Sequence, residues 1–568
     1  MEDLGTSRQG TVTAAAPYTL TPGTLAAAAF AACVASVALS IPAVLNGLFQ
    51  VDLGPTSSQL TWISDAFFVP ICLLELTFGV LGDLFGRKPL LVAGAVTLAL
   101  GEAVALLTPG AGSSAGTRVL VLWIGQIIAG TGAAALLPTS LAMVAAGTHT
   151  ARARARAITI WTAGLAAGGV VSPVLGGLMA KVAFGSDTNA GWRWAFACVL
   201  VLGLVSAVVS LALARNSAAP EGRSLDWPGQ ITIAVALFAL LFAVIQGPTS
   251  GWGSAPVVSG FVLAAVFLLL FILAERRSAA PLLRLDFFAN RAFAVTAIVT
   301  VVGLFAFLGT AYATSIRMAA IQGFTPLKTS IAFVCLNGMT LVLAPLTARL
   351  LERYNPKWVL GGGFFLIGAG DLWLAAVPAT NLSVAPIVVP LIVVGAGSAL
   401  ALSSVTAVAV NTMPNHLAGM ASGTTNMLRD FGFTLGPAIV GAVALSRAAA
   451  TIQQNLAASP ALRGALAAFN ASAAHVPPAQ RPSVEAAVHA VGSGPLGANA
   501  VPATVTLPTG QSVPFNPLKD VAFHALSHAY SAGYLLCAVA ALAAAALAVA
   551  AVGGRADETL LDPRTLTD

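Results

Sequence analysis

The sequence predicts an all-α, polytopic membrane protein with about fourteen transmembrane helices, arranged as two pseudo-symmetric six-helix bundles with two helices inserted between them. The first reason is composition, because 57% of the 568 residues are hydrophobic and only 8% are charged, whereas soluble globular domains have about 25% charged residues. The second is a series of apolar runs of about 20 residues, the length that crosses a bilayer. The third is an internal repeat between the two halves.

The apolar runs follow one another along nearly the whole chain. Spans are expected near 24–46, 61–82, 90–108, 118–145, 157–182, 194–214, 229–246, 255–274, 292–315, 328–350, 358–377, 386–410, 421–446 and 529–553. The large non-membrane segment near 447–528 is rich in alanine and proline, and it is expected outside the cell as either a cap or a mobile linker.

These spans define the expected domain organisation. It consists of a cytoplasmic N-terminal segment (1–23), an N-terminal six-helix bundle (24–214), two inserted helices with cytoplasmic linkers (215–291), a C-terminal six-helix bundle that includes the large loop (292–553), and a cytoplasmic tail (554–568).

Basic residues indicate the orientation in the membrane. When the spans are counted along the chain, the short loops that carry these basic residues all lie on the same side of the membrane. An excess of basic residues marks the cytoplasmic side, so both termini are expected there. This distribution explains the net charge of +6 without nucleic acid as a partner. The excess of arginine over lysine and the abundant alanine suggest a bacterium with GC-rich DNA, so the expected location of this multi-pass protein is the inner (plasma) membrane of a bacterial cell. No cleavable signal pattern opens the chain. The residues are Arg87, Lys88, Arg152, Arg154, Arg156, Arg215, Arg223, Arg276, Arg277, Arg284 and Arg291.

Cysteine and histidine usage gives no indication of a metal or cofactor. All five cysteines lie in apolar runs without ligand spacing, and the pair His524 and His528 has no evident third ligand. No Walker loop and no G-x-S-x-G elbow is found, so enzymatic catalysis is not expected.

The internal repeat relates the two halves. Gly130–Ser140 is similar to Gly395–Ser404, and Pro109 and Pro173 are matched by Pro378 and Pro437, with an offset near 265–269 residues. Such spacing indicates two related six-helix units. The alternative is that alanine- and glycine-rich helices look alike by chance.

The turn between the second and third spans carries the most specific motif. Gly86 suits the positive φ of a tight reversal, Gly79 permits close helix approach, and Asp83 lies within reach of Arg87 and Lys88. This string resembles the G-x-L-x-D-x-x-G-R-[RK] signature of the major facilitator superfamily. The resemblance implies a latch that holds one conformation from the cytoplasmic side. The alternative is an ordinary hairpin with basic flanks.

The fifth span has small residues at every fourth position, which predicts a groove for close helix packing. The same stretch resembles the G-x-x-x-G-P-x-x-G-G antiporter motif of exporters in that superfamily, although a serine replaces the glycine before the proline. The resemblance favours export over uptake. The residues are Gly164, Gly168, Ser172, Pro173, Gly176 and Gly177.

Further strings extend the resemblance over almost the whole chain, to the fourteen-helix drug:proton antiporter branch. They are Trp192–Phe196, Leu225–Gly229, Pro281–Phe288, Gln322–Pro326 and Gly419–Asn426. Two departures are equally informative. Cys33 stands where that branch usually has an acid, and Gln126 stands where it has an arginine, so proton coupling must use other residues or be absent.

Charged residues within the spans are candidates for proton coupling, because a lone charge in the bilayer needs a partner, water or a function. The resemblance places the second span between the halves and favours its two acids. The acids of the third and eleventh spans lie about 21 Å up their helices and are expected to be solvated and structural. The adjacent pair in the thirteenth span points about 100° apart, so each member is expected to pair with another helix. The candidates are Asp65 and Glu75, then Glu102 and Asp371, then Arg429 and Asp430.

The resemblance implies a central cavity lined by the first, fourth, ninth and twelfth spans. Their polar and aromatic residues include no acid, which suits an amphipathic or lipophilic substrate held by buried area. The residues are Ser36, Asn46, Gln126, Thr139, Ser140, Phe305, Phe307, Thr310, Tyr312, Ser398, Ser403 and Ser404.

The sequence therefore predicts a proton-coupled exporter of lipophilic or amphipathic compounds, such as drugs or antibiotics, that works by alternating access. Its expected partners are the small-molecule substrate, protons and membrane lipid, and it is expected to be a monomer. Two alternatives stay open: a dedicated exporter of one endogenous metabolite, and a membrane receptor or scaffold that does not transport.

Overall fold

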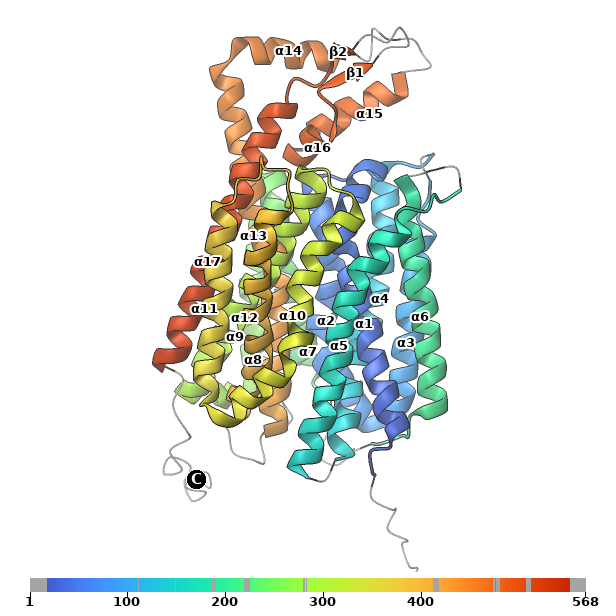
Figure 1. Ribbon diagram of the computed structural model, residues 1–568, viewed down its shortest axis with the longest axis vertical. Helices are drawn as coiled ribbons and strands as arrows, with labels where there is room; N and C mark the ends of the chain where they lie inside the picture. The colour runs from blue at the N-terminus through green and yellow to red at the C-terminus, as the bar shows by residue number, and fades with distance from the viewer. Residues whose placement is uncertain are drawn as a thin grey trace, which may run out of the picture.

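The computed structural model describes residues 18–551 except 111, 149, 186, 188, 219–224, 279–280, 282, 284, 412–417, 473–475, 477–480 and 507–511. Within these residues, fourteen helices are long and apolar enough to cross a membrane, which confirms the predicted class (Figure 1).

The helices form two halves and an inserted pair. The N-terminal half comprises α1 (Pro22–Asp52), α2 (Ser57–Phe85), α3 (Arg87–Leu106), α4 (Ala115–Ala146), α5 (Ala151–Met179), the short η1 (Asn189–Gly191) and α6 (Trp192–Leu213). The inserted pair is α7 (Trp227–Ser250) and α8 (Ala255–Arg277), followed by η2 (Leu285–Ala289). The C-terminal half comprises α9 (Arg291–Ser315), the π-helix η3 (Ile316–Ile321), α10 (Pro326–Arg353), α11 (Pro356–Ala376), α12 (Ala385–Asn411), α13 (Ala418–Ala458) and α17 (Lys519–Ala551).

Local sequence determines where these helices begin. At α2, Thr56 and Gln59 form a reciprocal capping box, in which the Gln59 amide donates to Thr56 Oγ1 and the Thr56 amide donates to Gln59 Oε1. Ser114 caps α4 and Thr325 caps α10 by accepting from the backbone of the first turn. These caps satisfy backbone donors that a helix start leaves unpaired.

A small domain, which we call the cap, lies at one end of the bundles. It contains α14 (Pro460–Ala471), α15 (Arg481–Gly492), α16 (Pro495–Ala500) and the antiparallel strands β1 (Thr504–Thr506) and β2 (Ser512–Pro514). Figure 1 shows the cap beyond the ends of α13 and α17. Both of these helices are longer than predicted, because they continue past the apolar stretch toward the cap. We call this end of the bundles the cap end, and the opposite end, which carries the α2–α3 turn, the turn end.

The two halves meet along two sides. On one side α2 packs against α13, and on the other α5 packs against α10. Helix α7 contacts both α2 and α13, where Leu241 and Ile245 form an apolar cluster with Val69 and Ala438. The inserted pair therefore lies beside the α2–α13 contact between the halves.

Candidate functional site

The α2–α3 turn is held by the residues that follow α6. Gly86 has a φ of +99°, and a Cβ there would lie 2.8 Å from the Asn216 side chain, so only glycine fits. Arg87 forms a 2.7 Å ion pair with Asp83 and donates to Ser217 Oγ. This pairing agrees with the expected reach of Asp83 toward Arg87.

Two details of the turn differ from expectation. Lys88 Nζ donates to Leu211 O at the end of α6. Gly79 has no atom within 4 Å of an added Cβ, so the close helix approach expected there is absent, because the groove of α2 at this level faces open space.

The small residues of α5 pack mainly against α1 of the same half. A Cβ at Gly168 would lie 2.3 Å from Cys33 O, and one at Gly164 would lie 2.5 Å from Ala29 O. Ser172 Oγ donates to Val37 O at 2.7 Å, so the serine that replaces the motif glycine is hydrogen-bonded.

Gly177, at the end of the same motif, faces the other half. A Cβ there would lie 2.7 Å from Leu327 Cα on α10. The motif therefore combines a packing seam within the N-terminal half with one close contact between the halves at the cap end.

Charged side chains meet across the α2–α13 contact. Arg429 lies 4.0 Å from Glu75 Oε1 of the other half and 2.7 Å from Asp430 Oδ1, and it also donates to Asn426. Arg429 and Asp430 were each expected to pair with another helix, and both interact with Glu75 of α2. The additional ion pair between the two neighbours was not expected, and it forms because the long arginine side chain folds back onto Asp430. Glu75 and Asp430 are 4% and 5% exposed, and with both ionised this cluster has one more negative than positive charge.

The other acid of α2 lies closer to the cap end. Asp65 is fully buried, and neither of its carboxyl oxygens has a hydrogen-bond partner among the described residues. One helical turn away, Thr61 Oγ1 lies 2.8 Å from Tyr312 Oη on α9, which is a hydrogen bond between the halves. A second tie nearby joins Asn46 Nδ2 of α1 to Ser315 Oγ at 2.8 Å. The halves are thus joined at the cap end directly beside a buried acid.

The acids of α3 and α11 are not solvated, which corrects the expectation. Glu102 and Asp371 are both 0% exposed. Asp371 accepts a 2.7 Å hydrogen bond from Thr310 of α9, whereas neither oxygen of Glu102 has a partner within the described part of the chain. Height along a helix indicated the wrong environment, because burial of these acids depends on the helices that pack against α3 and α11, and for Asp371 these include α9, which carries Thr310.

The polar residues expected to line a central cavity are mostly buried in this conformation. Asn46 and Tyr312 form the ties between the halves. Gln126 is 0% exposed, and its side chain has no hydrogen-bond partner among the residues that the structure describes. Ser403 is exposed. The remaining expected residues are buried: Ser36, Thr139, Ser140, Phe305, Phe307, Thr310, Ser398 and Ser404.

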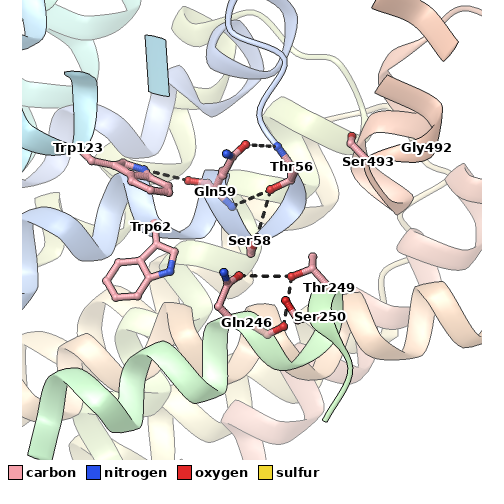
Figure 2. Close-up of a pocket in the computed structure, with 10 residues that line it drawn as sticks. All are labelled: Thr56, Ser58, Gln59, Trp62, Trp123, Gln246, Thr249, Ser250, Gly492 and Ser493. Carbon is pink, nitrogen blue, oxygen red and sulfur yellow. Dashed lines mark hydrogen bonds between the residues drawn. The ribbon is translucent and has the colours of Figure 1, made fainter. Parts of the chain in front are cut away.

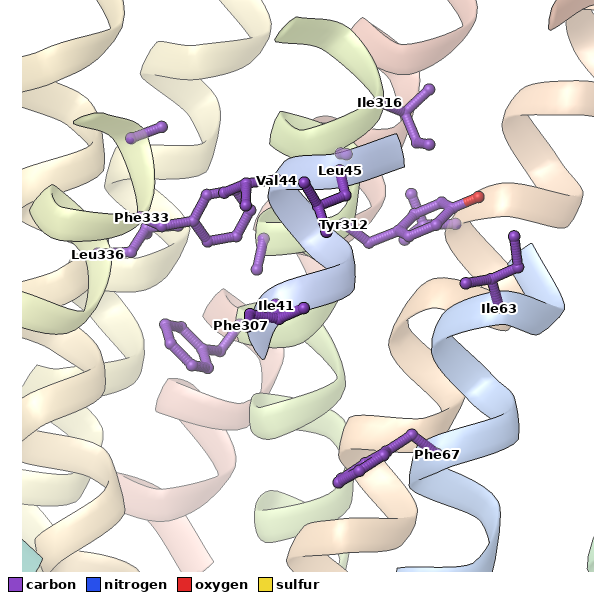
Figure 3. Close-up of a cluster of buried hydrophobic side chains, with 14 of the residues drawn as sticks. Ile41, Val44, Leu45, Ile63, Phe67, Phe307, Tyr312, Ile316, Phe333 and Leu336 are labelled. Carbon is purple, nitrogen blue, oxygen red and sulfur yellow. The ribbon is translucent and has the colours of Figure 1, made fainter. Parts of the chain in front are cut away.

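Apolar side chains close the centre between α1, α2, α9 and α10. Figure 3 shows Ile41 and Leu45 of α1 beside Phe307 and Tyr312 of α9, with Phe333 of α10 on the left side of α1. The cap-end half of the molecule is therefore sealed by apolar packing together with the two hydrogen-bonded ties.

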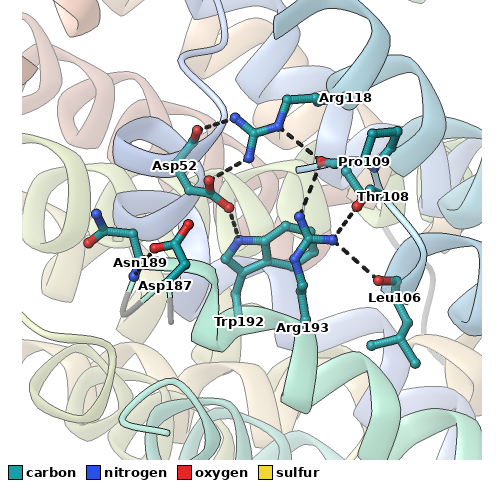
Figure 4. A network of polar contacts seen from close by, with 9 residues as sticks. All are labelled: Asp52, Leu106, Thr108, Pro109, Arg118, Asp187, Asn189, Trp192 and Arg193. Carbon is teal, nitrogen blue, oxygen red and sulfur yellow. Dashed lines mark hydrogen bonds and ion pairs between the residues drawn. The ribbon is translucent and has the colours of Figure 1, made fainter. Parts of the chain in front are cut away.

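The sequence did not lead us to expect a polar network that lies at the cap end (Figure 4). Asp52, at the end of α1, pairs with Arg118 at 2.5 Å and accepts from Trp192 Nε1 at 2.7 Å. Arg193 stacks over Trp192 and donates to the carbonyls at the end of α3, including Pro109 O at 3.2 Å. The network joins α1, α3, α4 and α6 into one unit. The sequence signal that could have indicated it is the set of charged residues at the edges of the apolar runs.

Two helical halves that meet along α2–α13 and α5–α10, with buried charges at the α2–α13 contact, define the architecture of a secondary membrane transporter. The chain belongs to the Major Facilitator Superfamily, whose family model matches residues 27–437.

Relatives with curated descriptions agree with this membership. The chain is 31% identical over 397 residues to Multidrug resistance protein Stp of Mycobacterium tuberculosis, covering 70% of this chain and 71% of that protein. It is 26% identical over 426 residues to the Tetracenomycin C resistance and export protein of Streptomyces glaucescens, covering 75% and 76%.

Solved structures share the fold. A bacterial homologue of the human lysosomal transporter Spinster, in an inward-facing and unoccupied conformation, matches with a TM-score of 0.61 at 13% identity, covering 94% of this chain and 98% of that one.

Proposed function

We propose that this protein exports lipophilic or amphipathic compounds, such as drugs or antibiotics, across the bacterial inner membrane in exchange for protons. In this proposal the turn end faces the cytoplasm and the cap lies outside. The positions of Arg87, Lys88, Arg276 and Arg277 at the turn end support that orientation. The curated descriptions of the relatives, which name multidrug resistance and antibiotic export, support the substrate class.

One observation carries the coupling scheme: α2 bears two buried acids, and each lies beside a contact between the halves. Asp65 is one turn from the Thr61–Tyr312 tie, and Glu75 faces Arg429. The acids are ten residues apart, about 15 Å along the helix. A change at either contact therefore alters the surroundings of an ionisable group on the same rigid element.

The proposed cycle uses this arrangement. When the cap-end ties open, water reaches Asp65, which takes a proton from outside as substrate leaves. When the cap end closes and the turn end opens, Asp65 gives up this proton, which leaves to the cytoplasm through water and Glu75. Glu75 is attracted less strongly to Arg429 while it carries the proton, and release of the proton restores that attraction. A charge that crosses 100 mV is worth about 2.3 kcal/mol, so one proton supports a substrate gradient of roughly fiftyfold.

Proton release from acid-loaded inside-out vesicles tests this function. Adding several unrelated lipophilic compounds should release the pH-sensitive dye from quenching in vesicles with the intact chain, and Asp65→Asn or Glu75→Gln should abolish the signal. Glu352→Gln is the matched control, since Glu352 is exposed at the turn end of α10. Compound flux with no proton movement would overturn the coupling, and binding with no flux would overturn transport.

A further inference from the structure

A pocket of about 330 Å³ lies at the cap end, away from the centre of the bundles (Figure 2). Its walls come from the first turns of α2, from α4, from the last turn of α7, and from the turn between α15 and α16. The lining residues are Thr56, Ser58, Gln59, Trp62, Trp123, Gln246, Thr249, Ser250, Gly492 and Ser493.

Two indole rings form the apolar wall. The ring centroids of Trp62 and Trp123 are 6.4 Å apart and tilted by 57°, and Phe238 supports Trp62 from α7 at 5.9 Å. Aromatic groups gain about 0.5–1.5 kcal/mol from such tilted or offset partners beyond the area that they bury. The wall therefore suits a planar aromatic group.

On the polar wall of the pocket, several acceptor oxygens already accept hydrogen bonds from neighbouring groups, whereas some N–H donors have no partner among the described residues. Gln59 Oε1 accepts from the Thr56 amide, Gln59 O accepts from Trp123 Nε1, and Gln246 Oε1 accepts from Thr249 Oγ1. By contrast, the N–H groups of Trp62 Nε1, Gln59 Nε2 and Gln246 Nε2 have no hydrogen-bond partner among the described residues. Figure 2 shows the nitrogens of Trp62 and Gln246 directed into the space between the two side chains.

Unpaired N–H donors favour a ligand that offers lone pairs. A carbonyl, hydroxyl or ether oxygen satisfies them, whereas a permanent cation without lone pairs does not. No charged side chain is among the described residues that line the pocket, so these residues offer a cation no counter-ion. Indole faces attract cations as well, which makes a cationic compound the appropriate comparison.

We propose that this pocket binds neutral aromatic compounds that carry hydroxyl or carbonyl groups, and that it holds them as they leave the transporter. The role of the pocket in holding compounds that leave the transporter rests on the proposed export function. Gly492 and Ser493 place the cap in the wall of this site, and the next helix, α16, contacts the end of the C-terminal half through Asn499, which donates to Ala320 O at 2.9 Å and Ile321 O at 3.2 Å. The cap therefore contributes both to the site and to the seal beside it.

Titration calorimetry of the purified full chain tests the site without transport. The probes are p-nitrophenyl β-glucoside, a neutral aromatic compound rich in oxygen acceptors, and tetraphenylphosphonium, an aromatic permanent cation. The glucoside should bind more tightly than the cation, and Trp62→Ala should weaken glucoside binding about tenfold or more. The matched control is Trp227→Ala, which removes an indole that is 55% exposed at the opposite end of α7.

A second variant avoids disturbing the packed indoles. Ser250 is exposed at the rim, so Ser250→Arg should preserve the fold, place a cation in the pocket and fill its spare volume, and thereby abolish glucoside binding. Tighter binding of tetraphenylphosphonium than of the glucoside would overturn the ligand class. Unchanged glucoside affinity in both Trp62→Ala and Ser250→Arg would overturn the site.

Efflux from vesicles separates the exit role from the capture of an external compound. If the pocket holds leaving substrate, Ser250→Arg should lower the efflux rate of neutral aromatic compounds while proton-coupled efflux of cationic compounds persists. Lost binding with unchanged efflux of the neutral compounds would overturn the exit role. Failure of the export function itself would be seen separately, as absent flux in the unchanged chain.

Discussion

Glu75 of α2 and Arg429 of α13 lie 4.0 Å apart across the contact between the two halves, and Asp430 holds the same guanidinium at 2.7 Å. One cation thus serves two acids that belong to different halves. Movement of one half against the other changes the Glu75–Arg429 distance while the Arg429–Asp430 pair travels with α13. We therefore expect Glu75 to be the member of the cluster whose surroundings depend on the relative position of the halves.

Removing the shared cation should destabilise the folded protein. Arg429→Ala leaves two buried acids without a counter-charge, and breaking a buried pair in this way costs about 3–5 kcal/mol. The double variant Arg429→Ala/Glu75→Gln should recover part of that loss, because one of the two charges is gone. Thermal unfolding in detergent measures both, and a double variant no more stable than Arg429→Ala would contradict the shared role.

The Thr61–Tyr312 hydrogen bond should hold the cap end closed. Tyr312→Phe removes it, at a cost of about 1 kcal/mol, which raises the population opened at that end roughly fivefold. The readout is the rate at which a membrane-impermeant maleimide labels Ile316→Cys, a fully buried position, in a chain whose five native cysteines are replaced by alanine.

Tyr534→Phe is the matched control for this experiment. Tyr534 makes the same kind of hydrogen bond with Thr314 at 3.0 Å, but within the C-terminal half. Labelling should accelerate in Tyr312→Phe and stay at the starting rate in Tyr534→Phe. Equal acceleration in both would show general loosening of α9 instead of an opened tie.

The Asp52–Arg118–Trp192 network should contribute stability and leave the transport step unchanged. Asp52→Asn leaves the buried Arg118 without its ion pair and should lower the unfolding free energy by about 3–5 kcal/mol, with unchanged efflux per folded molecule. Asp187→Asn is the control, because Asp187 is only partly buried and accepts from the Asn189 backbone. A normal melting temperature in Asp52→Asn would rule out the structural role.

Two glycines of the α5 motif should respond differently to the same change. Gly168→Val inserts a side chain against α1 within one half and should reduce folded protein, whereas Gly177→Val pushes α5 from α10 and should speed labelling of Ile316→Cys. Gly362→Val, at a position with nothing within 4 Å, is the control for both. If Gly177→Val lowers folded protein without altering labelling, the contact between the halves is only a packing contact.

Local patterns predicted most of the fold, because span length and loop charge are properties of short stretches. The Asp83–Arg87 pair was predictable for the same reason, since the two residues are four positions apart in the sequence and lie on either side of the tight α2–α3 turn. The Glu75–Arg429 contact was not, because residues more than 350 positions apart meet only after the halves assemble. Glu102 and Asp371 show the same limit: their depth follows from residue count, but their burial depends on neighbouring helices.

The repeat also has a structural counterpart that single motifs did not reveal. Arg193 donates to carbonyls at the end of α3, including Leu106 O, and Arg317 donates to Leu374 O and Pro378 O at the end of α11. These helix ends are equivalent in the repeat, yet the two arginines come from different elements, α6 and η3. Arginines at non-equivalent positions therefore cap equivalent helix ends in the two halves. An alignment of the two halves by sequence does not place Arg193 opposite Arg317.

Helix α7 is fastened diagonally across the molecule. Near the turn end, Gln230 is hydrogen-bonded to Thr77 and to Leu73 O of α2, in the N-terminal half. Just beyond its cap end, Trp252 Nε1 donates to Ser446 Oγ of α13, in the C-terminal half, at 3.3 Å. Helix α7 is thus attached to one half near the turn end and to the other half near the cap end. If the halves rock during the proposed transport cycle, we expect α7 to act as a brace that limits the rocking angle until the exposed Trp252–Ser446 hydrogen bond breaks.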